Sequence, residues 1–128
     1  MAFTFSGAAS RFNEKRRLIA EEVNTVETAY LRLRLLPQEA QLGLQELFRR
    51  YVDSRLETYR RMPNMPAAGK EMANSKMLQD EIWHQAVAAT RLPNANADAG
   101  KLLLPALNNM IDMATRTMAP QNHPPRII

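Results

Sequence analysis

The sequence contains no cysteine, and among its 128 residues there are only two histidines and four glycines. Without thiols the chain cannot form disulfides, zinc–thiolate sites or iron–sulfur clusters, and it has no cysteine nucleophile. No glycine-rich phosphate-binding loop occurs, and none of the serines lies in the glycine elbow of a hydrolase. We therefore expect that the protein is not an enzyme and that it binds no cofactor.

Long hydrophobic runs are also missing. No apolar stretch reaches the roughly twenty residues that a membrane-spanning helix needs. The first residues do not form a secretory signal peptide either, because the basic residues follow the apolar ones instead of preceding them. The chain as given is therefore expected to contain no membrane span.

Positive charge is concentrated in one short segment. The net charge is +4, and residues 11–17 contain four basic residues, Arg11, Lys15, Arg16 and Arg17, against Glu14 alone. Elsewhere acidic and basic residues nearly cancel, as on a solvated helix surface. Because no basic stripe runs along the chain, we expect no nucleic-acid partner.

Apolar spacing predicts four helices and no strand. The helices are expected at about 11–36, 37–62 and 69–92, with a fourth that ends near residue 118 and that either starts after Asp98 or kinks at Pro105. The prolines of PNMPAAG, residues 63–69, predict a long connection there. The fold class is therefore predicted to be all-α, an antiparallel bundle of four helices, in which an even number of helices returns the chain to the end where it began.

The predicted core lies along one stripe of each helix. On the first helix the apolar residues recur at spacings of four and three, which is the pattern of a narrow seam. This seam either faces the bundle interior or packs against another copy of the chain; its residues are Ile19, Val23, Val26, Tyr30 and Leu33. The predicted inner face of the second helix is Leu44, Leu47, Phe48, Tyr51, Val52, Leu56 and Tyr59.

One pair of residues has the spacing of metal ligands. Glu81 and His84 form an E-x-x-H motif, by which a helix supplies two ligands to a di-iron centre in a bundle. Such a centre needs a second copy of the motif, and the only other histidine, His123, lies in a proline-flanked tail. We therefore predict that both residues are exposed on the helix surface and that there is no metal site.

The eight methionines suggest a different function class. Methionine adapts to varied surfaces, so a methionine-rich groove would suit a soluble adaptor that binds a partner helix. Methionine at helical spacing is, however, also ordinary core material. Both interpretations remain open from the sequence.

Both ends of the chain become apolar beyond basic residues. Phe3 and Phe5 precede the basic cluster, and Arg126 is followed by Ile127 and Ile128. If both ends continue as membrane helices, the nearby basic residues, with Arg116 among them, would be charges that hold a loop in the cytoplasm. On this interpretation residues 1–10 end a membrane helix, 11–119 form the bundle and 120–128 lead into the next membrane helix. The alternative is a disordered arm and frayed termini.

Several stretches in this order resemble bacterial bestrophin-like membrane proteins. They are FTFSGAASRFNEKRRLIAEEVNTVETAYLRLRLLP, LFRRYVDSRLETYR, LLPALNNMIDMATRT and HPPRII. The resemblance implies a cytoplasmic helical region between the second and third of four membrane helices, on the cytoplasmic side of the bacterial inner membrane. It also implies a homo-oligomer whose partners are its own membrane helices and an anionic lipid surface.

A more remote similarity connects the first helix to the bestrophin anion channels. Arg11, Phe12, Glu14 and Arg16 stand where those proteins have an Arg-aromatic-x-Glu-x-Arg pattern. The similarity implies an oligomeric anion channel. The chain has no dense acidic cluster of the kind that binds calcium in animal bestrophins, so calcium gating is not implied.

Overall fold

The computed structural model describes residues 2–118, with side chains described from Asn13 onward. This part of the chain is all-α and contains no strand. Its elements are α1 (Ala2–Arg32), the short 3-10 helix η1 (Leu33–Leu35), α2 (Gln38–Arg61), α3 (Met65–Thr90) and α4 (Ala99–Met118). The predicted antiparallel bundle of four helices is confirmed.

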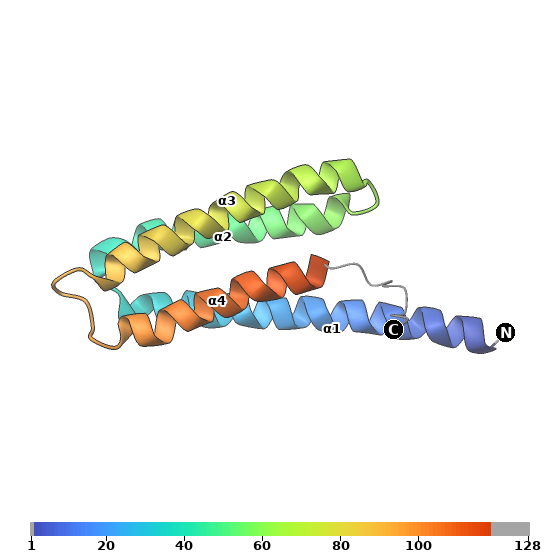
Figure 1. Ribbon diagram of the computed structural model, residues 1–128, viewed down its shortest axis with the longest axis horizontal. Coiled ribbons are helices and arrows are strands. Elements are labelled where there is room, and N and C mark those ends of the chain that lie inside the picture. Colours follow the sequence, from blue (N-terminus) through green and yellow to red (C-terminus); the bar gives the residue numbers. More distant parts are fainter. Residues whose placement is uncertain (1, 119–128) are drawn as a thin grey trace, which may run out of the picture.

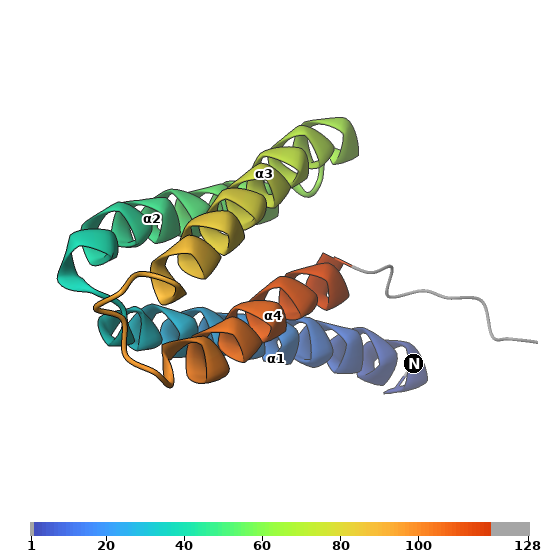
Figure 2. The ribbon, with the colours of Figure 1, turned by 60° about the vertical axis from the view of Figure 1, so that its left-hand side comes forward.

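The bundle is built from two helical hairpins. Helix α2 packs closely against α3, and α1 packs closely against α4, whereas the two hairpins contact each other chiefly through α3, α4 and η1. Figures 1 and 2 show that the hairpins meet at the end near η1 and diverge toward the other end. The start of α1 and the end of α4 lie at the same, diverging end (Figure 1), as an even number of antiparallel helices requires.

The predicted long connection before α3 is wrong. Helix α3 begins at Met65, so that only Pro63 and Asn64 separate it from Met62, the C-cap of α2. The Asn64 side chain caps the helix, because its Oδ1 accepts a hydrogen bond from the Ala67 backbone N–H at 3.2 Å. Pro66 fits the first turn because backbone N–H groups there have no acceptor within the helix, so the N–H that proline lacks is not needed.

The other helix boundaries differ less from the prediction. Helix α1 already includes residues 2–10, and its last turn tightens into η1 before Pro37. Pro37 is the N-cap of α2 rather than its first helical residue. Helix α4 starts at Ala99 with Pro105 inside it, and the Asn96 side chain accepts a hydrogen bond from the Asp98 backbone N–H at 2.8 Å just before it.

The hydrophobic core fills the end of the bundle near η1. It contains residues from every helix, and its largest side chains are fully buried. The members of the cluster are Ala29, Leu33, Leu36, Leu44, Leu47, Phe48, Tyr51, Leu78, Ile82, Ala86, Ala89, Ala99, Leu103, Ala106, Leu107 and Met110.

Part of the predicted core on α1 and α2 is instead exposed. Val23 is 50% exposed, Tyr30 42%, Val52 36% and Leu56 57%. Toward the diverging end the helices bury polar residues beside apolar ones such as Met113 and Ala114. The buried polar residues are Glu22, Ser54, Arg55, Thr58, Ser75, Gln79 and Thr117.

Candidate functional site

Of the predicted basic residues of α1, Lys15 lies beside the end of α4. Lys15 Nζ donates to the backbone carbonyl of Thr117 at 3.5 Å, which brings the two helices together at the diverging end. A cation at this position also interacts favourably with the free carbonyls of the last turn of a helix. Arg116, one residue before Thr117, is exposed at the same end.

The basic residues of this end differ in how their charge is compensated. Arg17 forms ion pairs with Glu14 and Glu21, and its pKa is raised, first by the hydrogen bond with Glu14. Arg16 is exposed, and Arg116 Nη1 lies 3.5 Å from Met113 Sδ. Arg16, Arg17 and Arg116 are therefore the exposed basic residues described at this end, and Lys15 is half-buried.

The remaining predicted residues of the two ends are only partly covered by the structure. Phe3, Phe5 and Arg11 have helical backbone within α1, and their side chains are not among those described. Arg126, Ile127 and Ile128 lie outside the described residues. Because Lys15 lies beside Thr117, the thirteen residues of α1 before it run past the described end of α4 for roughly 20 Å (Figure 1).

A buried ion pair joins the two hairpins near this end. Arg55 Nε donates to Glu22 Oε2 at 2.6 Å, and only 8% of the Arg55 side chain and 5% of the Glu22 side chain are exposed. Tyr59 donates its hydroxyl to Glu22 Oε1, and the Arg55 guanidinium lies 5.3 Å from the centroid of the Tyr59 ring. Helical spacing gave no sign of this pair, since apolar periodicity carries no information on buried charges.

Burial and the ion pair act together on the pKa values of these groups. Burial lowers the pKa of Arg55, but its hydrogen bond with Glu22 and the carboxylate charge outweigh burial, so the net direction is upward. Burial and the hydrogen bond to Glu22 raise the pKa of Tyr59 well above its ordinary value of 10.0. Arg55 and Tyr59 therefore keep their protons throughout the physiological pH range, and the pair is a fixed structural contact.

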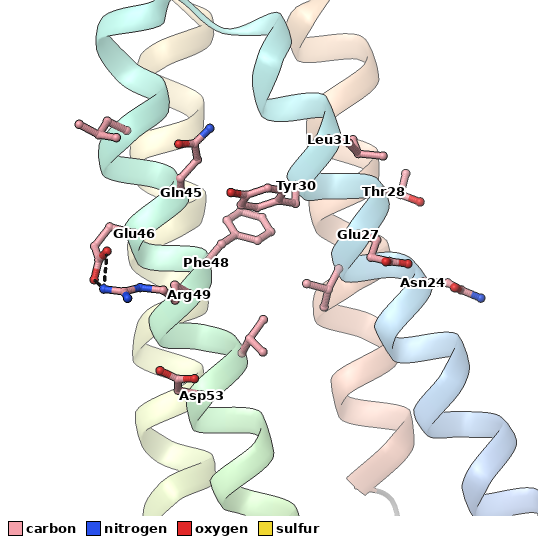
Figure 3. Close-up of a pocket in the computed structure, with 13 residues that line it drawn as sticks. Asn24, Glu27, Thr28, Tyr30, Leu31, Gln45, Glu46, Phe48, Arg49 and Asp53 are labelled. Carbon is pink, nitrogen blue, oxygen red and sulfur yellow. Dashed lines mark hydrogen bonds and ion pairs between the residues drawn. The ribbon is translucent and has the colours of Figure 1, made fainter.

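A hollow of about 880 Å³ lies between α1 and α2, and we call it the trough. Figure 3 shows the Tyr30 and Phe48 rings meeting across it, with a centroid distance of 5.7 Å and an interplanar angle of 66°. Its apolar lining is Val26, Tyr30, Leu31, Leu42, Phe48 and Val52. Glu27, Glu46, Arg49 and Asp53 supply the charged groups (Figure 3).

A second hollow of about 670 Å³ lies between α3 and α4. Met72 and Met118 line it together with Ile111, whereas no methionine lines the trough between α1 and α2. Other methionines divide between the core, where Met110 and Met113 are buried, and the exposed surface of α3. Methionines therefore line this hollow and also fill part of the core.

The E-x-x-H pair does not form a site in the described structure. Glu81 and His84 are both exposed, and Glu81 accepts a hydrogen bond from Gln85 Nε2 at 3.0 Å. Within residues 2–118 no cluster of three potential metal-ligating side chains exists.

Comparison with family models, with curated proteins and with solved structures finds no match to this chain. Among the described helices, none has both the length and the apolar character needed to cross a bilayer.

Proposed function

We propose that this chain is the cytoplasmic-side helical bundle of a four-span bacterial inner-membrane protein that resembles bestrophins, and that the whole protein is an oligomeric anion channel. In this proposal the bundle is a non-catalytic domain whose helices α1 and α4 connect to membrane helices before Phe3 and after Ile127. The proposal rests on the sequence resemblance and on the geometry of the two ends.

The observation that carries the proposal is the contact between Lys15 and Thr117. A cytoplasmic domain that connects two membrane helices must start and end at the same face of the membrane. The contact between Lys15 and Thr117 joins the first helix to the last turn of α4, as this requires. The exposed basic residues Arg16 and Arg116 are also found at that end. Basic residues near the cytoplasmic leaflet are attracted to anionic headgroups by about 1 kcal/mol each.

Anion flux from the full-length protein in liposomes tests the channel function. We expect flux above that of empty vesicles once the protein is shown to be folded and inserted. Flux equal to that of empty vesicles under those conditions would contradict the channel function.

The placement of the basic end has a separate test on the 128-residue chain. We expect binding to vesicles that contain anionic lipid, weakened by Arg16→Glu and Arg116→Glu and by added salt. Arg91→Glu makes the same charge change on an exposed residue at the opposite end of the bundle and is the matched control. Equal loss of binding in all three variants would contradict the proposed orientation.

A second candidate is a soluble adaptor that binds a partner helix, and the hollow between α3 and α4 favours it. Met72 and Met118 give this hollow an adaptable apolar lining. The coding sequence on either side of this segment distinguishes the candidates. Apolar runs of about twenty residues at both ends favour the membrane protein, whereas a start codon at Met1 and a stop codon after Ile128 favour the adaptor.

A further inference from the structure

Only part of the apolar seam of α1 is buried by packing within the chain. Leu33 is fully buried, but Val23 and Tyr30 are about half exposed, and they face solvent together with Leu31, which is 57% exposed. On α2 the neighbouring Leu42 is 76% exposed. Apolar side chains gathered in one exposed hollow indicate a binding surface more often than isolated exposed ones do.

The trough has a defined length and relief. Along α2 it extends from Leu42 to Asp53, roughly 17 Å at the rise of an α-helix, or three turns. Leu31 and Leu42 lie at one end and Val52 lies toward the other, while the Tyr30 and Phe48 rings form the middle. A helix of about three turns with small residues at its centre would match this relief.

The charges along the trough select a cationic occupant. Three acidic residues and one basic residue line the trough. The basic residue, Arg49, forms an ion pair with Glu46, in which Nη2 lies 2.9 Å from Oε2. On the α2 side, Asp53 adds negative charge beside Arg49. Glu46 makes the larger contribution to the raised pKa of Arg49, and Asp53 makes a smaller one. On the α1 side, Glu27 forms no ion pair or hydrogen bond with any described residue.

An exposed face of α3, which borders the hollow between α3 and α4 at Ala73 and Lys76, has the matching features. Met65, Gly69, Ala73 and Met77 follow one another at intervals of four residues and are all exposed, the two methionines by 61% and 69%. We call this row the α3 ridge. A Cβ added at Gly69 would meet no atom within 4 Å, so packing within the chain does not require the glycine.

Two lysines flank the α3 ridge on opposite sides. At 100° per residue, Lys70 and Lys76 project about 60° to either side of Ala73, and both are exposed. From Met65 to Met77 the ridge extends roughly 18 Å, nearly the length of the trough.

We propose that the α3 ridge of one copy of this chain docks into the trough between α1 and α2 of a second copy. The terminal methionines lie against the leucines at one end and Val52 at the other. Gly69 and Ala73 allow a close approach to the ring pair. The two lysines lie toward Glu27 and Asp53, one on each wall. Such ridges of residues four apart are what helices pack into the grooves of other helices.

The contact is heterologous, because the surface offered by one copy differs from the surface offered by its neighbour. Each dimer therefore retains one free trough and one free ridge, so further copies can add. Association ends when a ring closes, and it produces a filament if no ring closes. The inference concerns the chain itself and does not depend on the channel function or on the membrane placement of its ends.

Sedimentation velocity of the 128-residue chain over a range of concentrations tests the proposal. We expect concentration-dependent association of the wild type. Leu42→Glu in the trough and Met77→Glu on the ridge each weaken it about tenfold or more. Leu102→Glu alters a residue of α4 that is 43% exposed and belongs to neither surface, and it leaves association unchanged. Unchanged urea midpoints show that the variants remain folded.

Mixing the two defective variants gives the sharpest result. The Leu42→Glu chain keeps an intact ridge and the Met77→Glu chain keeps an intact trough, so an equimolar mixture forms one-to-one heterodimers that neither variant forms by itself. A mixture that stays monomeric would overturn the heterologous contact. So would a wild type that stays monomeric at its highest soluble concentration, or association that neither substitution weakens.

Gly69→Leu separates binding from folding. Leucine has a higher helix propensity than glycine by up to about 1 kcal/mol, and open space surrounds this position, so the variant should resist urea at least as well as the wild type. The same side chain prevents the close approach over the ring pair, so association should weaken about tenfold. Association equal to that of the wild type would contradict the docking geometry.

Discussion

The two ends of the bundle are held together by different chemistry. In the half near η1, which we call the closed half, the hairpins share a continuous apolar core that includes Phe48, Leu103 and Leu107. In the diverging half, which we call the open half, the buried contacts between helices are largely polar, such as Arg55 with Glu22 and Ser54 Oγ with Ser75 Oγ at 2.6 Å. Apolar burial stabilises without regard to direction, whereas polar contacts stabilise only while every partner is present.

The polar contacts of the open half are complete. Among the described residues no buried side-chain nitrogen or oxygen lacks a hydrogen-bond partner. Tyr51 accepts from Gln79 Nε2 at 2.9 Å where the two halves meet, and the Lys15 contact with Thr117 lies at the far end. The open half should therefore be specific in its arrangement and sensitive to the loss of any single partner, which the following substitutions measure.

The largest effect is expected from Glu22→Ala. The substitution leaves the Arg55 guanidinium buried without its carboxylate, which costs about 3–5 kcal/mol of unfolding free energy. Replacing both residues together, as Glu22→Met with Arg55→Met, leaves no uncompensated charge and should cost much less. Urea denaturation of both variants checks this. Equal losses in the single and the double variant would mean that the pair contributes only through packing.

In the closed half Leu107→Ala should cost about 2–5 kcal/mol, because Leu107 is fully buried and its truncation leaves a cavity. Leu102→Ala makes the same truncation on the exposed side of the same helix and should change the unfolding free energy by about 0.5 kcal/mol or less. Similar losses of unfolding free energy for Leu107→Ala and Leu102→Ala would contradict the position of Leu107 in the core.

Tyr51→Phe tests the point where the two halves meet. Tyr51 is fully buried, and burial raises the pKa of its hydroxyl, which therefore stays neutral and bonded to Gln79. Phenylalanine leaves the Gln79 amide without this partner, at a cost of about 1–3 kcal/mol. Tyr30→Phe removes a hydroxyl that has no hydrogen bond within the described residues, and its effect should be close to zero.

The sequence predicted the closed half better than the open half. On α3 and α4 apolar residues at helical spacing, such as Ile82, Leu103 and Leu107, are buried. This agrees with the prediction of one buried stripe on each helix, because spacing by three and four residues identifies the buried side of a helix. The rule that proline ends a helix places the start of α3 too late, because a proline such as Pro66 is tolerated within the first turn.

On α1 and α2 the same reasoning succeeded only in part, since Leu44, Leu47 and Tyr51 are buried as predicted but other residues of the pattern are not. Val23 and Leu56 belong to the apolar pattern but are exposed, while Glu22 and Arg55 are buried in positions that the pattern assigns to the surface. A buried pair of opposite charges separated by 33 residues leaves no periodic signal. The same-end placement of the helix ends followed from the helix count, but the contact between Lys15 and Thr117 required the structure.

The smallest effect concerns the pH dependence of the open half. Glu71 accepts hydrogen bonds from Asn74 Nδ2 at 2.8 Å and from Ser54 Oγ at 2.7 Å, and these bonds lower its pKa below the ordinary 4.5. As the pH falls, the unfolded chain therefore takes up this proton before the folded one does. The stabilisation is present above the ordinary pKa and is lost as the pH falls through the lowered value.

Glu71→Gln removes this titration while keeping an oxygen that can accept both hydrogen bonds. The variant should lose less unfolding free energy than the wild type between about pH 7 and about pH 3, which urea denaturation at both values measures. Glu46→Gln is the comparison in the closed half. The pKa of Glu46 is lowered mainly by its hydrogen bond with Arg49, but this pair is exposed, so that water and salt screen its effect. A larger change for Glu46→Gln than for Glu71→Gln would mean that the acid sensitivity of the molecule resides in its exposed ion pairs and not in the polar contacts between α2 and α3.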